Sequence, residues 1–193
     1  MEVVSTGREA RFTSSYRWDN ERHRHERYDI FQCGLSGSGV FEYRRDGELR
    51  RERIQAGRMF IASWQEPFAY WFEGREPWEF LWITLAGEFA DRVAAELGRI
   101  TPIISLPAGS APFAILASLQ DRLAGPVALD RYALSCVGFE FLVQLAKLAD
   151  RGIEDEEGRF IAEAREFAAR RITSADLPSL ARHFGYAEKY FIG

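Results

Sequence analysis

The sequence predicts an α+β protein, in which a sandwich or barrel of short strands precedes a run of helices. From residue 28 to about residue 85, short apolar runs alternate with turn signals at the spacing of an all-β fold. From residue 107 onward, apolar residues recur instead with helical periodicity. The switch between the two patterns separates an N-terminal β region from a C-terminal helical region.

Six strands are expected in the β region, and each is bounded by residues that favour turns. Asp46 and Gly47 form the strongest turn signal, because a type I′ hairpin turn requires positive φ at both of its central residues. The chain contains 15 Phe and 5 Trp residues, many of them in these segments, which suits pleated surfaces that pack face to face. The expected strands cover residues 30–35, 40–44, 49–54, 59–62, 68–72 and 78–85.

The helical region begins with a short helix from Phe89 to about Leu97, followed by one more expected strand at 102–106. Helical periodicity then covers residues 113–123 and 127–149. The second segment carries more apolar surface than one thin stripe, so we expect it to pack on its neighbour and on a second subunit. Simple burial within the monomer is the alternative.

The chain end suggests a separate module. Residues 151–158 are polar and acidic, as in a linker, and a further amphipathic helix is expected after them. We therefore expect a barrel at 1–106, a helical dimerisation segment at 107–150, the linker at 151–158 and a C-terminal segment at 159–193.

Composition sets limits on partners and compartment. The net charge of −4 argues against a protein that coats nucleic acid by charge alone. The N-terminus has no apolar signal core, and no run approaches the length that spans a bilayer, so we expect a cytoplasmic protein with no membrane partner. Cys33 and Cys136 are too far apart in sequence to suggest a metal knuckle, and buried thiols are the expectation.

The last eighteen residues are typical of the opening of a helix-turn-helix. Asp176 is a suitable N-cap, Gly185 is a suitable left-handed stop for the helix that follows it, and a second helix should begin near Glu188. In such motifs the second helix enters the major groove of DNA, which makes Glu188, Lys189 and Tyr190 the candidate DNA-binding residues. Because that helix has fewer than two turns before Gly193, we expect residues 1–193 to bind DNA poorly.

Residues 180–191, Leu-Ala-x-x-Phe-Gly-Tyr-Ala-Glu-Lys-Tyr-Phe, resemble the first helix-turn-helix of the AraC/XylS family of bacterial transcriptional regulators. Two positions depart from that pattern: Ala187 replaces the usual Ser cap, and Gly193 stands where a basic residue is common. The order of β region, helices, linker and helix-turn-helix is also similar to that family. The resemblance implies a cupin-like double-stranded β-helix, or jelly-roll, barrel that binds an effector, forms a homodimer and controls DNA binding in the full-length protein. It implies a regulator and no enzyme.

The candidate effector site is the barrel interior, since small-molecule sites are usually apolar and aromatic with a few polar anchors. Three of the candidates, Arg22, Tyr70 and Trp82, fall where related sugar-sensing members of the family place ligand contacts. Arginines near the first candidate suit an anionic or hydroxyl-rich ligand, so we expect a sugar or a small anion. Ordinary barrel core is the alternative for the aromatic candidates. The expected ligand-binding residues are Arg22, His25, Gln32, Trp64, Tyr70 and Trp82.

A metal site is the competing hypothesis. In an extended segment, His23, His25 and Asp29 would share one side, as in the two-His-one-carboxylate sites of metal-dependent cupin isomerases and dioxygenases. Against it, the other histidine of the chain is His183, and residues 68–70 offer no third histidine. We therefore expect no metal and no cofactor. A dimerisation module without any ligand is a third possibility.

Overall fold

The computed structural model describes residues 1–170 with gaps at 24 and 126–128, and their side chains as far as residue 150. By its internal contacts the chain divides into Met1–Ala149 and Asp150–Gly193, and the barrel and the pocket described below lie in the first unit. Residues 171–193 lie outside the described part. The expected helix-turn-helix, with Glu188, Lys189 and Tyr190, therefore stays a prediction from the sequence.

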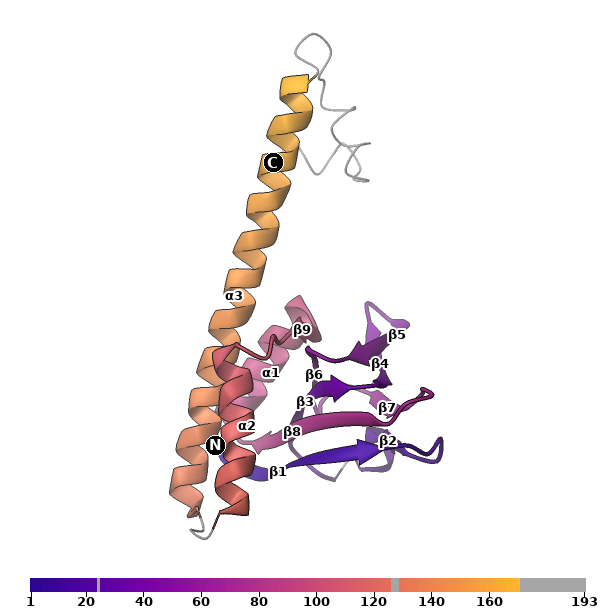
Figure 1. Cartoon of the computed structure of the whole chain (residues 1–193), viewed down its shortest axis with the longest axis vertical. Coiled ribbons are helices and arrows are strands. Elements are labelled where there is room, and N and C mark those ends of the chain that lie inside the picture. The colour runs from indigo at the N-terminus through magenta and orange to yellow at the C-terminus, as the bar shows by residue number, and fades with distance from the viewer. Residues whose placement is uncertain (24, 126–128, 171–193) are drawn as a thin grey trace. The chain divides into compact units, whose positions relative to one another are not determined.

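Two antiparallel sheets form the barrel in the described part of the chain (Figure 1). One sheet has the strand order β1-β8-β3-β6-β9 and the other the order β2-β7-β4-β5. The strands are β1 (Glu2–Arg11), β2 (Arg17–Asp19), β3 (Asp29–Ser36), β4 (Ser38–Arg45), β5 (Glu48–Gln55), β6 (Arg58–Ala62), β7 (Phe68–Phe72), β8 (Trp78–Ala86) and β9 (Ile103–Ser105). Together with the helices, these sheets make an α+β protein with a cupin-like barrel, as the sequence predicts.

Aromatic side chains fill the space between the two sheets. Successive strand residues point to opposite faces, so alternate residues of β3, β4, β6, β7 and β8 meet inside the barrel. Phe41 and Phe60 stack there with ring centroids 4.4 Å apart, and Trp78 is fully buried. This inner cluster includes Ile30, Phe41, Ile54, Phe60, Phe68, Tyr70, Phe72, Trp78 and Phe80.

Three helices cover the outer face of the five-stranded sheet (Figure 1): α1 (Glu88–Ile100), α2 (Ala111–Ala124) and the N-terminal part of α3 (Arg131–Arg170). Their apolar residues pack against the outward-facing residues of β3 and β8. Phe31 of β3, for example, makes an edge-to-face contact with Phe141 of α3, with centroids 5.6 Å apart. The four-stranded sheet carries no described helix on its outer face.

The six expected strands all form, with ends that differ from the structure by no more than two residues. The expected hairpin turn is confirmed as well, because φ is 52° at Asp46 and 79° at Gly47. Strands β1 and β2 were not expected. Strand β1 has only a weak apolar alternation, and it is held mainly by pairing with β8 from Glu2↔Ala86 to Arg11↔Trp78.

Three expectations about the helices and thiols need correction. Residues 151–158, expected as a linker, are helical, since α3 runs without a break from Arg131 to Arg170. The stretch Arg131–Asp150 is long and apolar enough to cross a membrane by length and composition, contrary to the expectation of no such run. Its Phe141, Leu142 and Leu145 are nevertheless fully buried in the domain core. Cys33 is buried as expected, whereas Cys136 on α3 is exposed.

Candidate functional site

Three of the predicted ligand residues, Gln32, Tyr70 and Trp82, face the barrel interior. Gln32 and Trp82 are direct Cα partners on β3 and β8, and Tyr70 comes from the opposite sheet. The Trp82 indole lies over Gly7 of β1, where an added Cβ would be only 2.1 Å from the ring, so a residue without a side chain makes room for it. Its Nε1 donates to Ser5 Oγ at 3.5 Å.

Several hydrogen-bond donors in this interior are buried without a partner. Gln32 is 1% exposed, and its Nε2 has no acceptor; the same holds for Nε1 of Trp18 and of Trp78. Burial raises the pKa of Tyr70 well above its usual value, and the neighbouring Tyr16 raises it further. Both tyrosines thus stay protonated at neutral pH. Buried donors of this kind normally bind water or another polar partner.

The other three predicted residues lie elsewhere. Trp64 is outside the barrel, where its Nε1 donates to Asp91 Oδ1 of α1 at 3.3 Å and the Arg27 guanidinium lies 5.5 Å from its ring. Arg22 is exposed at the end of a short 3-10 helix, η1 (Asn20–Arg22). The His25 side chain is 78% exposed. The six predicted residues therefore do not form one site.

The competing metal site is not assembled. The segment around His23 is not extended, since η1 precedes it and the Glu26 N–H donates to the His23 carbonyl in a turn, so the parity argument fails. His23 stacks on Trp18 with centroids 3.9 Å apart. Asp29 is fully buried and faces Asp91. Among the described residues, no group of three or more His, Cys, Asp or Glu side chains is placed to hold a metal ion.

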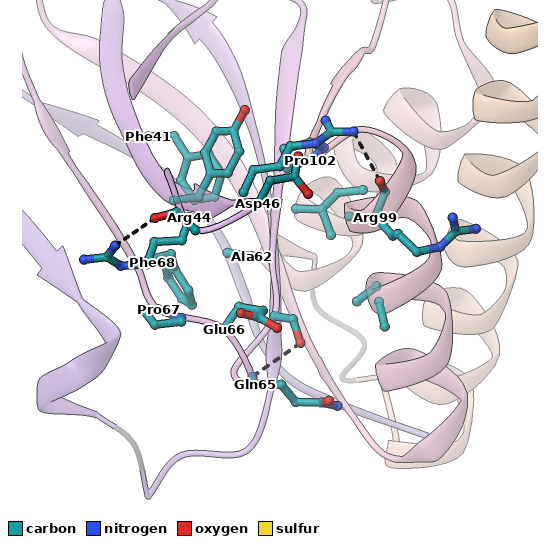
Figure 2. A pocket seen from close by; sticks show the side chains of 18 residues that line it. Phe41, Arg44, Asp46, Ala62, Gln65, Glu66, Pro67, Phe68, Arg99 and Pro102 are labelled. Atoms are coloured by element: carbon teal, nitrogen blue, oxygen red, sulfur yellow. Dashed lines mark hydrogen bonds between the residues drawn. The ribbon is translucent and has the colours of Figure 1, made fainter. Parts of the chain in front are cut away.

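An open pocket with a volume of about 550 Å³ lies at one end of the barrel (Figure 2). It is bounded by the β4–β5 hairpin, by the loop between β6 and β7, and by the C-terminal half of α1. The wall on α1 is made of small residues, Ala94, Ala95 and Gly98, which keep the pocket open. Its volume is within the range of small-molecule sites. The apolar residues of its lining are Phe41, Tyr43, Ile61, Ala62, Pro67, Phe68 and Pro102.

The floor of this pocket is the outermost layer of the barrel interior. Phe41 and Phe68 line the pocket and also belong to the inner cluster. From Phe41 the rings continue inward through Phe60, at 4.4 Å, to Tyr70, whose centroid is 5.1 Å from that of Phe60. A ligand in the pocket would therefore contact the same group of aromatic rings that includes Tyr70, one of the predicted ligand contacts.

Charged groups surround the pocket unevenly. Arg45 reaches from the hairpin to α1, where its Nη2 donates to the carbonyl oxygens of Arg99 at 3.4 Å and Ile100 at 3.3 Å. Asp46 and Glu66 also line the pocket, and within the described part of the chain neither carboxylate forms an ion pair. Figure 2 shows Asp46 at the hairpin and Glu66 beside Gln65 and Pro67 of the loop between β6 and β7, both across the pocket from α1.

This pocket could not be predicted from the sequence. The turn at Asp46-Gly47 and the small residues Ala94, Ala95 and Gly98 were visible in the sequence, but separately. Their meeting depends on the packing of α1 beside β6, at a sequence distance of about thirty to fifty residues, and no local pattern encodes that.

Comparison with known proteins identifies the type of domain. Residues 3–142 match the protein family described as "AraC-like ligand binding domain". No curated protein matches the sequence. Among solved structures, the AraC-like transcriptional activator CuxR has a similar fold, with 10% identity over 97% of this chain and 65% of that chain, and a TM-score of 0.52. This chain thus spans about two-thirds of the length of CuxR.

Two further structures are more distant. ToxT from Vibrio cholerae has 10% identity over 96% of this chain and 72% of that chain, with a TM-score of 0.43. The R92A mutant of Bacillus subtilis oxalate decarboxylase OxdC has 14% identity over 61% of this chain and 28% of that chain, with a TM-score of 0.34.

Proposed function

Because the chain belongs to the family that carries the AraC-like ligand binding domain, we propose that it is an effector-responsive transcriptional regulator without enzymatic activity. The barrel binds a small molecule, and the C-terminal part of the full-length protein binds specific DNA. Ligand binding acts by favouring one arrangement of sensor and DNA-binding module over another, a coupling that is typically worth about 1–3 kcal/mol.

The pocket at the barrel end is the observation that carries this proposal. It combines a volume of about 550 Å³, an aromatic floor and a small number of polar groups, which together are the usual make-up of an effector site. Tyr70 supports the floor from within through Phe60. Contacts from Gln32 and Trp82 remain predictions, supported by the unpaired Gln32 Nε2, which a deeper ligand oxygen or a water molecule would satisfy.

We also propose that α3 mediates a homodimer. One stripe along α3 has the alternating four- and three-residue spacing of a coiled-coil seam. It consists of Tyr132, Cys136, Phe139, Val143 and Ala146. Tyr132 is 66% exposed and Phe139 50% exposed, and Phe139 stacks beside Phe89 of α1 with centroids 4.9 Å apart. A continuous apolar stripe of this kind is typical of a surface that a partner covers.

A ligand screen tests the sensing role. The 193-residue chain would be heated with a panel of sugars, aromatic acids, alkyl acids and organic amines, and compounds that raise its Tm would be titrated by tryptophan fluorescence. We expect Ala95→Phe, which fills the pocket, to weaken binding at least tenfold. Ala111→Phe, at an exposed position on α2 outside the pocket, should leave it unchanged. Equal affinity in both variants would exclude this pocket as the site, and the Trp82→Ala variant then tests the deeper interior.

A further inference from the structure

The pocket at the barrel end carries chemical information about its ligand. We propose that it binds an organic cation, an ammonium group attached to an apolar body; this rests on the proposed sensing role of the same pocket. Three features of the described residues support it: two carboxylates, the C-terminal end of α1, and the aromatic floor.

The carboxylates supply the negative charge. Asp46 sits at the tip of the β4–β5 hairpin and Glu66 in the loop between β6 and β7, so they approach the pocket from two sides. Neither forms an ion pair within the described part of the chain, whereas eight other carboxylate–cation contacts at 4.0 Å or less join residues outside the pocket lining. Their charge is thus available to a ligand.

The three arginines of the lining do not pair with these carboxylates, and of the three only Arg45 leaves its positive charge at the pocket edge. Figure 2 shows the Arg44 and Arg99 side chains extending in opposite directions, away from the space between the hairpin and α1. Arg44 Nη1 donates to the Gly47 carbonyl at 3.4 Å. Arg45, the remaining arginine of the lining, is held by the two carbonyl oxygens at the end of α1.

The C-terminal end of α1 also attracts positive charge, although Arg45 already binds two of its carbonyl groups. The last carbonyl groups of a helix have no partner within the helix, and their summed dipoles favour a cation at that end. Arg45 already demonstrates this preference, since its guanidinium comes from another element to bind the carbonyls of Arg99 and Ile100. Gly98 and Pro102 of the pocket lining flank these carbonyl groups on either side.

The floor suits both parts of such a ligand. Phe41 and Tyr43 stack with centroids 5.2 Å apart, and Phe68 lies beside Phe41 at 6.2 Å, so the floor offers several aromatic surfaces. The faces of aromatic rings attract ammonium groups and also bury apolar bodies. Burial raises the pKa of Tyr43, and the neighbouring Glu52 raises it further, so its hydroxyl adds no competing positive or negative charge at neutral pH.

Three probes that share one apolar group and differ in net charge test the proposal. The probes are 4-phenylbutylamine, 4-phenylbutanol and 4-phenylbutyrate, titrated calorimetrically into the 193-residue chain at pH 7.5. We expect the ammonium to bind at least tenfold more tightly than the alcohol, and the carboxylate to bind most weakly. In the double variant Asp46→Asn, Glu66→Gln, the preference for the ammonium should fall below threefold. Asn tolerates the positive φ of Asp46, so the hairpin should keep its shape.

Glu96→Gln is the matched control, because Glu96 is an exposed carboxylate of α1 outside the pocket lining. It should leave the preference unchanged. Equal binding of the three probes, tighter binding of the carboxylate, or no binding of any probe would overturn the cation proposal. If the alcohol or the carboxylate binds in a manner that Ala95→Phe abolishes, the sensing role of the pocket stands and only its ligand class is wrong.

Discussion

The carboxyl group of Asp29, at the start of β3, lies next to that of Asp91 on α1. Asp29 is fully buried, and burial is the main reason why its pKa rises from 3.8 to about 7. The negative charge of Asp91 raises it further, while Ser63 lowers it. No cation pairs with either carboxyl among the described residues, although the Arg27 guanidinium lies nearby over the Trp64 ring. The junction between barrel and helix thus contains an acid that is neutral below about pH 7.

Asp29 should therefore make the protein less stable as pH rises. Its pKa is higher in the folded than in the unfolded state, so the unfolded state loses this proton first, and the free energy of unfolding falls between about pH 4 and pH 7. The rise of the Asp29 pKa by about three units corresponds to a loss of up to about 4 kcal/mol in the free energy of unfolding, and this loss is complete above pH 7. We expect Asp29→Asn to stabilise the protein at pH 8 and to have a smaller effect at pH 5, as measured by urea unfolding. The same pH dependence in Asp29→Asn and in the exposed control Glu96→Gln would contradict this.

Two glycines should respond to alanine in opposite directions. A Cβ at Gly39 would lie 2.3 Å from the fully buried Trp78 ring, so Gly39→Ala should cost about 1–3 kcal/mol by overpacking the core. A Cβ at Gly98, within α1, meets nothing within 4 Å, and Gly98→Ala should stabilise the helix by about 1 kcal/mol. Thermal unfolding of both variants measures the difference. A stable Gly39→Ala protein would mean that the Trp78 ring is less confined than the structure shows.

Most of the fold could be predicted from the sequence because the patterns that encode it are local. The Asp46-Gly47 turn and the apolar runs of β3 to β8 are each complete within about ten consecutive residues, so they can be recognised without knowing the tertiary structure. Strand β1 has no such pattern and depends on β8, about eighty residues away. The acidic residues 154–157 suggested a linker, although Glu is also a good helix former, and the helix continues through them.

The site was predicted only in part. Gln32, Tyr70 and Trp82 were expected in the barrel interior, Tyr70 and Trp82 from the family resemblance, and their side chains lie there, while their role as ligand contacts stays a prediction. The parity argument that put His23, His25 and Asp29 on one side was wrong, because a 3-10 helix precedes His23 and a turn follows it. The pocket at the barrel end brings together a hairpin, a loop and a helix, and only the tertiary packing of these three elements places Asp46, Glu66 and Ala95 around one space.

The proposed dimer predicts a specific effect of Phe139. Half of its side chain is exposed on the α3 stripe, beside Phe89. Phe139→Asp should place a charge in the centre of the seam and shift the protein from dimer to monomer at micromolar concentration, as measured by sedimentation. Glu140→Gln, at an exposed position next to the stripe, should leave the dimer intact. A wild-type protein that is monomeric in the same experiment would contradict the dimer proposal.

Arg45 should compete with a cationic ligand. Its guanidinium occupies the carbonyl oxygens of Arg99 and Ile100 and adds a positive charge to the pocket edge. Arg45→Gln removes that charge, so we expect 4-phenylbutylamine to bind several-fold more tightly while 4-phenylbutanol is little affected. Calorimetric titration measures both. Weaker binding of the amine in this variant would show that Arg45 supports the ligand instead of opposing it.

We propose above that the pocket at the barrel end senses a ligand and thereby controls transcription. The most direct measurement is a reporter assay with the full-length gene product, in which a ligand that binds the isolated chain is added to cells carrying the wild-type protein or Ala95→Phe. We predict a ligand-dependent change of reporter activity with the wild type and none with Ala95→Phe, at equal protein levels. The same response in both, or no response of the wild type to a ligand that occupies the pocket, would contradict the account.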